Sequence, residues 1–184
     1  MYEINLLPYK TTPKPQKVTL QNINPKKKLA VFDLDETLVH CLVKDIDKCD
    51  NILKITMPSS NQIATIGVNI RPGWEDAIKR LSLTYNIVIY TASHKSYADA
   101  VLNFLDPNNI YFYNRLYRNN CIDIVYNNSH VYIKDMTIFE KYFSLKDVVI
   151  IDNSVMAFAF DLNNGVPILP YYDAKQDIEL MFCV

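Results

Sequence analysis

Two aspartates stand close together at the end of an apolar run in the segment AVFDLDETLVH, residues 30–40. Asp33 directly follows the run, and Asp35 comes two residues later. In an extended backbone, side chains at this spacing point to the same side. Two carboxylates on one side can hold a cation, attack an electrophile or exchange a proton with a substrate. The simpler alternative is that Asp35 or Thr37 caps a helix.

Other apolar runs of the chain also end in polar or reactive groups. Thr91, Ala92 and Ser93 follow IVIY (87–90), and Lys134 follows VYI (131–133). Asp152 and Asn153 follow VVII (148–151). Open parallel sheets bind ligands beyond the carboxyl ends of their strands. If these runs are neighbouring parallel strands, their terminal groups meet the two aspartates at one edge of the sheet.

The combined set suits phosphoryl transfer. Mg²⁺ prefers hard oxygen ligands and leaves coordination positions for a substrate phosphate. The Thr91 hydroxyl, the backbone N–H groups that follow it and the charge of Lys134 can hold phosphate oxygens. A carboxylate nucleophile then implies an aspartyl-phosphate. Alone, Thr91 is a turn residue, Lys134 a solvated strand end and Asp152 part of a turn, so the prediction depends on the joint pattern.

Other phosphate chemistries lack their residues in this chain. Glycine occurs only at positions 67, 73 and 165, which excludes both a P-loop and a dinucleotide-binding fingerprint. A calcium loop counted from Asp33 would need Gly and Glu where Leu38 and Lys44 stand. No cysteine is followed six residues later by the arginine of a cysteine phosphatase. The carboxylate route is the one that the sequence supports.

The elements that must position these groups alternate between strands and helices. Helical spacing of apolar residues appears in 71–83, 95–105 and 174–182. We predict strands at 29–32, 51–57, 63–70, 86–90, 110–117, 130–134 and 148–151. The alternation predicts an α/β fold, a Rossmann-like parallel sheet flanked by helices. The pair 51–57 and 63–70 reads as a hairpin, so we expect a small antiparallel insertion at about 41–70, after the first strand.

Composition fits one globular domain, because 49% of the 184 residues are hydrophobic and 21% are charged. Residues 1–28 contain four prolines and no clear periodicity, so we expect an extended arm or linker before a domain at 29–184. The segment PKKK (25–28) is more typical of a solvated segment that leads into the domain than of a nuclear localisation signal.

The four cysteines form no CxxC pair, which argues against structural zinc.

Charge and hydropathy narrow the partners and the location. The net charge of −1 gives no general attraction to nucleic acid, so direct nucleic-acid binding is not expected. No segment reaches the roughly 18 apolar residues of a membrane helix, and the N-terminus lacks a signal-peptide layout. We expect a soluble intracellular protein, with nucleus or cytoplasm undecided and the oligomeric state unknown.

Six segments occur in the order found in phosphatases of the haloacid dehalogenase superfamily: DLDETLVH, RPG, YTAS, YIKDM, IIDNS and NNGVPI. Within it, the chain resembles the small RNA polymerase II C-terminal-domain phosphatases, also called NLI-interacting-factor-like phosphatases. The resemblance runs from about residue 29 to residue 180. It implies the haloacid dehalogenase core fold, with the β insertion placed after the first strand.

The resemblance implies a role for each group. Asp33 would be the nucleophile, and Asp35 would protonate the leaving oxygen and then deprotonate water. Thr91, Ala92 and Lys134 would hold the phosphoryl oxygens. Mg²⁺ would bind Asp33, the backbone carbonyl of Asp35 and Asn153. The implied catalytic set is Asp33, Asp35, Thr91, Lys134 and Asp152, with Asp152 close to the metal.

In this family the insertion helps to form a substrate groove, which here would involve Val43, Ile55, Met57, His94 and Tyr97. His94 makes this wall less apolar than in the relatives, so the sequence of the phosphosite stays open. We therefore predict a Mg²⁺-dependent phosphoserine/phosphothreonine protein phosphatase, with the polymerase tail as one candidate substrate. Two alternatives remain: a catalytically silent protein-binding module on the same fold, and a small-molecule phosphatase.

Overall fold

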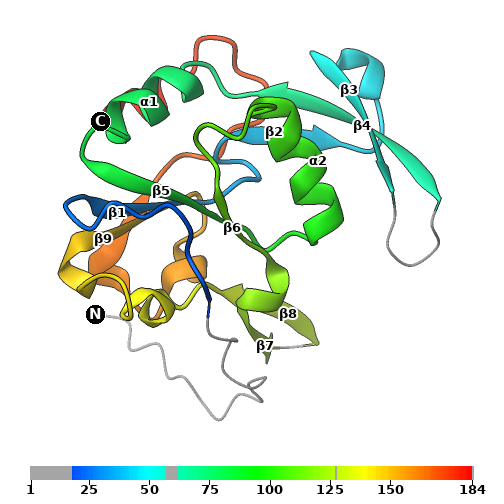
Figure 1. Ribbon diagram of the computed structural model, residues 1–184. Coiled ribbons are helices and arrows are strands. Elements are labelled where there is room, and N and C mark those ends of the chain that lie inside the picture. The colour runs from blue at the N-terminus through cyan, green and yellow to red at the C-terminus, as the bar shows by residue number, and fades with distance from the viewer. Residues whose placement is uncertain (1–17, 57–61, 127, 184) are drawn as a thin grey trace.

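The computed structural model describes residues 18–56, 62–126 and 128–183. A parallel sheet of five strands forms its centre, in the order β10-β9-β1-β5-β6, which confirms the predicted α/β fold (Figure 1). The strands are β1 (Lys28–Phe32), β5 (Tyr85–Tyr90), β6 (Asn114–Leu116), β9 (Val148–Asp152) and β10 (Gly165–Pro167). Phe32 stands opposite Ile89 on one side and Ile151 on the other, so these three strands end at the same level.

Alternating side chains of β1 lie in two hydrophobic cores, one on each face of the sheet. Ala30 and Phe32 enter the core that α1 (Trp74–Leu81) and α2 (Lys95–Leu105) cover. Leu29 and Val31 enter the second core, together with Met136 and other side chains from the segment that follows β8 (Ser129–Ile133). A strand buried on both faces is apolar at every position, which explains the uninterrupted run of the sequence.

Short 3-10 turns take the place of α-helices on the second face. Within the described part of the chain, the two α-helices both pack on the first core, so helices flank the sheet less evenly than predicted. The 3-10 turns are η1 (Ile46–Lys48), η2 (Arg118–Asn120), η3 (Met136–Phe139), η4 (Leu145–Asp147), η5 (Val155–Phe158), η6 (Leu162–Asn164) and η7 (Glu179–Cys183). Across residues 18–56, 62–126 and 128–183, no helix has both the length and the apolar character to cross a bilayer.

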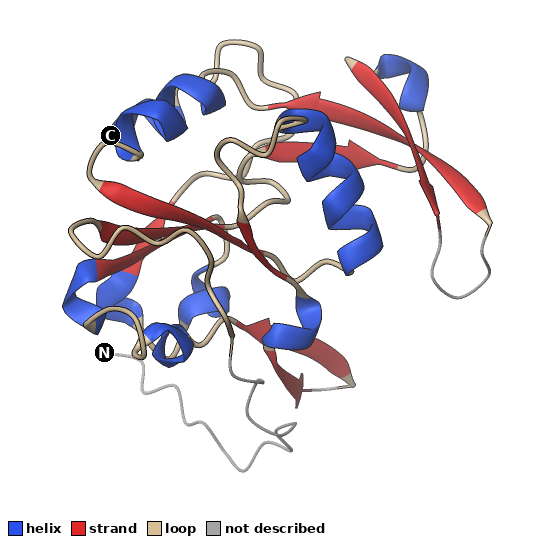
Figure 2. Ribbon diagram, in the orientation of Figure 1, coloured by secondary structure: helices blue, strands red, loops and turns tan. Residues whose placement is uncertain are grey.

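The predicted insertion is present as an antiparallel sheet of three strands, in the order β2-β4-β3. Its strands are β2 (Val39–Leu42), β3 (Asn51–Thr56) and β4 (Ile63–Ile70), so the expected hairpin gains β2 as a third strand. Figure 2 shows these strands set apart from the central sheet, beside α2. The predicted residue Met57 lies outside the described residues.

Two strand predictions need correction. The predicted strand 110–117 is reduced to β6, because the Asp106 carboxylate accepts the backbone N–H groups of Ile110, Tyr111 and Phe112 at 2.8–2.9 Å. The predicted strand 130–134 is present as β8 (Ser129–Ile133) but does not join the central sheet. It forms an antiparallel hairpin with β7 (Ile122–Tyr126), a strand that was not predicted from the sequence.

The predicted closing helix 174–182 is wrong. Only η7 is helical there, in 3-10 form, and it lies beside α1. Asp177 accepts the backbone N–H of Glu179 at 3.2 Å, as a residue that precedes a helix does. The same carboxylate binds Arg71, so residues 174–177 are held outside the helix.

The last part of the predicted arm packs on the domain. Leu20 is buried in the second core. Gln21 exchanges two hydrogen bonds with the Asn114 side chain, at 2.7 and 2.9 Å. The described residues that precede β1 therefore contact β6 at the edge of the sheet.

Arg71 joins the loop after β1 to the C-terminal segment. Its side chain is fully buried, and Nε and Nη2 donate to Asp177 at 2.7 and 2.9 Å. The other bonds go to two backbone carbonyls, those of Thr37 at 3.1 Å and Leu169 at 2.8 Å. One guanidinium thus stabilises both the loop that carries the aspartates and the chain that ends the domain.

Replacing Arg71 by Met is expected to lower the free energy of unfolding by about 3–5 kcal/mol, because it leaves Asp177 and two carbonyls without their buried partner. The free energy of unfolding of Arg71→Lys should lie between those of wild type and Arg71→Met, because an ammonium cannot form the paired hydrogen bonds of a guanidinium. Urea unfolding measures this free energy, provided that its dependence on urea concentration has the same slope in all variants. Lys79→Ala, which removes an exposed pair with Glu75, is the control that should stay near wild type. An Arg71→Met protein as stable as that control would contradict the role.

Candidate active site

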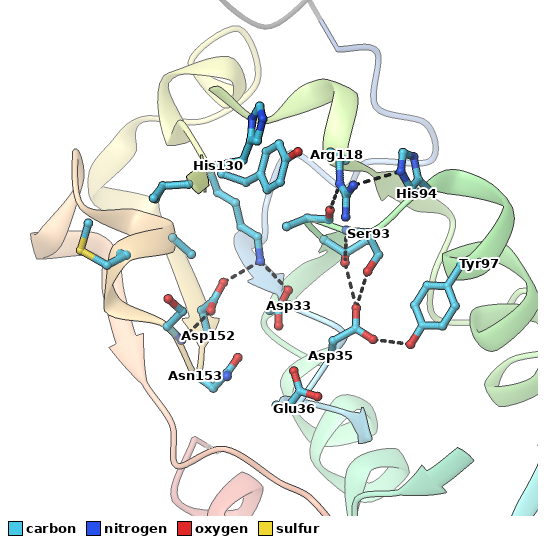
Figure 3. A pocket seen from close by; sticks show the side chains of 18 residues that line it. Asp33, Asp35, Glu36, Ser93, His94, Tyr97, Arg118, His130, Asp152 and Asn153 are labelled. Carbon is cyan, nitrogen blue, oxygen red and sulfur yellow. Dashed lines mark hydrogen bonds and ion pairs between the residues drawn. The ribbon is translucent and has the colours of Figure 1, made fainter. Parts of the chain in front are cut away.

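The predicted polar groups line one cavity of about 750 Å³. It lies beyond the carboxyl ends of β1, β5 and β9, where a parallel sheet places its ligands (Figure 3). The structure brings together Asp33, Asp35, Thr91, Ala92, Lys134, Asp152 and Asn153 as lining residues. Ser93, which the sequence placed at this edge without a role, also lines the cavity. Eight further lining residues had no predicted site role, namely Glu36, Arg118, His130, Val131, Tyr132, Ser154, Met156 and Ala157.

Asp33 is held from both sides of its carboxylate. Its backbone N–H donates to the carbonyl of Ile151 at 3.0 Å, which extends the contact between β1 and β9 by one residue. Oδ1 accepts from Lys134 Nζ at 2.5 Å, and Oδ2 lies 3.2 Å from the Thr37 hydroxyl. The side chain is buried yet borders the cavity, which is the placement that a nucleophile requires.

Lys134 reaches this carboxylate from the β7–β8 hairpin and not from a strand of the central sheet. Its backbone N–H donates to the carbonyl of Ala157 at 2.6 Å, which fixes the end of the hairpin against η5. Nζ also contacts Asp152 Oδ2 at 2.6 Å. Burial alone would lower the pKa of Lys134, but the charges of Asp33 and Asp152 outweigh it and raise the pKa. The ammonium is therefore charged between two buried carboxylates.

Asp152 has a pKa raised to about 6, first by burial and then by the neighbouring charge of Asp33. Lys134 opposes this shift, as does the backbone N–H of Ser154, which donates to Oδ1 at 2.8 Å. Asp152 thus anchors the ammonium from the side opposite Asp33.

Thr37, which the sequence indicated only as a possible helix cap, connects two of the predicted metal ligands. Its fully buried hydroxyl lies 3.2 Å from both Asp33 Oδ2 and Asn153 Oδ1. The loop that carries it turns through Glu36 at φ 55° and closes with a bond from Leu38 N–H to the Leu34 carbonyl. The threonine of the motif D-x-D-x-T was the available signal.

Asp35 points away from the buried ammonium, toward α2 and the loop after β5. Tyr97 donates its phenol to Oδ1, while the hydroxyls of Ser93 and Thr91 lie 2.7 and 3.4 Å from Oδ2 (Figure 3). Burial raises the pKa of Asp35 to about 6, and the charge of Asp33 adds to the increase. The two aspartates therefore differ in environment: Asp33 is paired with a cation and Asp35 with neutral hydroxyls.

Arg118 organises the rim of the cavity. Its Nε donates to the Ala92 carbonyl at 2.6 Å, and Nη1 lies 3.0 Å from His94 Nε2. The guanidinium also lies 4.8 Å from the ring centroid of Tyr132, on the β7–β8 hairpin. These contacts give the rim a polar and basic wall. Only tertiary structure reveals them, because Arg118 stands in an unremarkable polar turn of the sequence.

The predicted groove residues separate in the structure. Tyr97 and His94 line the cavity, whereas Val43 and Ile55 are not among its lining residues. Ile55 is only 7% exposed and packs in the first core, against the same side of the insertion as α2. Val43 is 77% exposed, just beyond β2. The sequence could not separate these cases, because a strand residue faces core or solvent according to how its sheet is docked.

The donor chemistry of the cavity fits a hard divalent cation. Asp33 and Asn153 present oxygen atoms on either side of the Thr37 hydroxyl, and the buried acids outnumber the buried ammonium. Mg²⁺ binds through one or two carboxylates plus other oxygens, not through a cage of acids. The described residues contain no group of three or more His, Cys, Asp or Glu side chains that could hold a metal ion.

The model of the NLI interacting factor-like phosphatase family matches residues 28–184. CTD small phosphatase-like protein 2 of Dictyostelium discoideum is 37% identical over 163 residues, which cover 88% of this chain and 27% of that protein. The human CTD small phosphatase-like protein is 34% identical over 155 residues, which cover 84% of this chain and 53% of that protein. The chain thus spans about half or less of the length of these relatives.

Solved structures share the fold. The fission yeast RNA polymerase II CTD phosphatase Fcp1-R271A bound to beryllium fluoride superposes with a TM-score of 0.65 at 19% identity. The match covers 86% of this chain and 49% of that chain. A second Fcp1 structure, described as an essential RNA polymerase II CTD phosphatase, gives a TM-score of 0.63 at 22% identity over 84% of this chain and 45% of that one. The predicted haloacid dehalogenase-type core is confirmed at the level of the fold.

Proposed function

The chain belongs to the NLI interacting factor-like phosphatase family, and from that premise we propose that it is a Mg²⁺-dependent phosphoserine/phosphothreonine protein phosphatase. It works through an aspartyl-phosphate on Asp33. The proposal assigns residues 29–184 to the phosphatase domain and 1–28 to an N-terminal arm. The observation that carries it is the contrast between Asp33, which is bound by Lys134, and Asp35, which is bound only by hydroxyls among the described residues.

In the first step, Asp33 attacks the phosphorus atom and the bond from phosphorus to the serine or threonine oxygen breaks. The electron pair of that bond goes to the leaving oxygen, which takes a proton from Asp35. Lys134 and the Thr91 hydroxyl hold the phosphoryl oxygens as charge moves among them. Such placement is the main contribution that a loose phosphoryl transition state needs from the protein.

In the second step, Asp35 accepts a proton from water, which attacks the phosphorus of the aspartyl-phosphate. The bond between phosphorus and the Asp33 oxygen breaks, and phosphate leaves with Asp33 restored. Asp35 is protonated again, so it acts first as an acid and then as a base. A carboxylic acid with a pKa near neutrality is suited to both roles.

Mg²⁺ would be held by Asp33, the backbone carbonyl of Asp35 and Asn153, with Asp152 nearby. When bound, it neutralises the negative charge of the phosphoryl group as the carboxylate approaches. The Thr37 hydroxyl lies between two of these ligand side chains and contacts Asp33 Oδ2 and Asn153 Oδ1.

A protein substrate is favoured by the openness of the cavity. The three-stranded insertion packs beside α2, and residues of β2, β3 and β4 are not among those that line the cavity. A phosphorylated side chain on an extended segment can therefore enter from solvent. The RNA polymerase II tail is a candidate, since the names of the relatives refer to that domain. His94 and Arg118 at the rim also allow a different phosphosite sequence.

The substrate class is tested by comparing kcat/KM for a phosphoserine peptide, glucose 6-phosphate and AMP, each with Mg²⁺ and with EDTA. We expect the peptide to be preferred by at least about tenfold, because only it extends over the rim. EDTA should remove turnover, and added Mg²⁺ should restore it. Preference for a metabolite would favour a small-molecule phosphatase. Absence of turnover with every ester would favour the silent binding module.

A further inference from the structure

We infer that Tyr97 is a positioning residue for Asp35: its phenol holds the carboxyl group at the angle from which a proton reaches the leaving oxygen. The inference rests on the proposed function and goes beyond it, because the resemblance had placed Tyr97 in the wall of a substrate groove. The structure gives the phenol a partner inside the site instead (Figure 3).

The two oxygens of Asp35 receive their donors from different elements. Tyr97 lies near the start of α2 and donates to Oδ1. Ser93, in the loop after β5, donates to Oδ2 at 2.7 Å. The Ser93 backbone N–H in turn donates to the Thr91 hydroxyl at 3.0 Å, so the loop itself is fixed. The Thr91 hydroxyl lies farther from Oδ2, at 3.4 Å. Because each oxygen has a donor from a different element, the plane of the carboxyl group is set by both α2 and the loop.

These donors separate Asp35 from the charged centre of the site. Lys134 is already bound to Asp33 and Asp152. Asp35 stands only two residues from Asp33 in the same loop. The bond from α2 holds Asp35 on the side of Tyr97 and Ser93, and Figure 3 shows Asp33 between Asp152 and Asp35. Each aspartate can therefore keep its own role.

Hydroxyl partners suit a group that gains and loses a proton in every cycle. A hydroxyl can donate to a carboxylate, and it can also accept from a carboxylic acid by rotating its O–H bond. An ammonium has no acceptor position, so it would oppose the protonated form. Tyr97 and Ser93 can hold Asp35 in one place through both steps, before and after its proton moves to the leaving oxygen.

The ring of Tyr97 also packs in the fold, so the test must remove its hydroxyl without removing the ring. It is half-buried and packs against the first core together with Leu53 and Trp74. Tyr97→Phe keeps the ring and removes only the hydroxyl. Tyr117→Phe is a matched control. The Tyr117 phenol also donates to a carboxylate of α2, that of Asp99 at 2.6 Å, but Tyr117 does not line the cavity.

The test compares kcat/KM for a phosphoserine peptide and for an aryl phosphate, with Mg²⁺ present. A serine alkoxide needs a proton to leave, whereas a nitrophenolate leaves without one. We expect Tyr97→Phe to lower kcat/KM about 10- to 100-fold for the peptide and less than about threefold for the aryl phosphate. Tyr117→Phe should leave both values unchanged. Ser93→Ala should show the same bias as Tyr97→Phe, which provides a second measurement from the other oxygen.

The outcomes separate the inference from the proposed function. If wild type hydrolyses neither ester, the proposed function fails and takes the inference with it. If wild type hydrolyses both, equal losses with the two substrates in Tyr97→Phe would overturn the positioning role alone. Wild-type activity in Tyr97→Phe together with a raised KM in Tyr97→Ala would also overturn the positioning role. Those two results would mean that the ring of Tyr97 binds substrate as part of a groove wall.

Discussion

Turnover of phosphate esters is expected to fall at least about 10⁴-fold when Asp33 is replaced by Asn. The amide nitrogen and oxygen cannot form the acyl-phosphate that the proposed route requires. The loss should be the same for aryl phosphates and phosphoserine peptides, because a good leaving group does not replace a missing nucleophile. This distinguishes Asp33 from Asp35 and Tyr97, whose effects depend on the leaving group.

The measurement is a single-turnover reaction with a ³²P-labelled ester, quenched in acid. Wild type should show label bound to the protein through an acid-stable, hydroxylamine-sensitive bond, and Asp33→Asn should show none. Asp45→Asn is the matched control, because Asp45 is exposed and pairs with Lys48 in the insertion. An Asp33→Asn protein that stays folded and retains turnover within about tenfold of wild type would remove the proposed nucleophile.

Addition of beryllium fluoride and Mg²⁺ tests the same carboxylate without catalysis. The fluoride mimics a phosphoryl group on an aspartate, so it should raise the melting temperature of wild type by binding the folded state. Asp33→Asn should not respond. A response in wild type together with no turnover would indicate a binding module that has kept its phosphoryl site.

The central sheet was predictable because burial on both faces leaves a clear record in the sequence. β1, β5 and β9 are apolar at nearly every position, and each is followed at once by a polar group. The carboxyl ends of parallel strands meet, so Asp33, Thr91 and Asp152 could be expected at one edge before any geometry was known. Their placement needed only the order of the strands.

The rest of the site depends on contacts that short sequence patterns do not encode. Lys134 follows a strand that is exposed at its start and buried at its end, and nothing local shows that its hairpin lies outside the central sheet. The predicted helix at 174–182 has suitable spacing, yet the bond between Arg71 and Asp177 holds its first turn in another conformation. Tyr97 has helical spacing toward the core, and only the docking of α2 directs its hydroxyl to Asp35.

The second large effect is expected at Lys134. This ammonium is almost wholly buried between Asp33 and Asp152, at 2.5 and 2.6 Å. Lys134→Met leaves two carboxylates without a cation in a buried site, which should lower the free energy of unfolding by about 3–5 kcal/mol. It also removes a positive charge from the phosphoryl oxygens, so turnover should fall about 10²- to 10³-fold even in the folded fraction.

The double variant Lys134→Met with Asp152→Asn separates these two effects. Removing one carboxylate relieves the buried charge, so stability should recover part of its loss, while turnover should not recover, because the phosphoryl group still lacks its cation. Urea unfolding in EDTA and kcat with saturating Mg²⁺ measure the two quantities on the same proteins. Lys141→Met, on an exposed lysine beside Tyr142, is the control for loss of a surface charge. If the double variant is no more stable than Lys134→Met, Asp152 is not the anchor of the ammonium, and the division of the site into a charged centre and an acid bound by hydroxyls loses its basis.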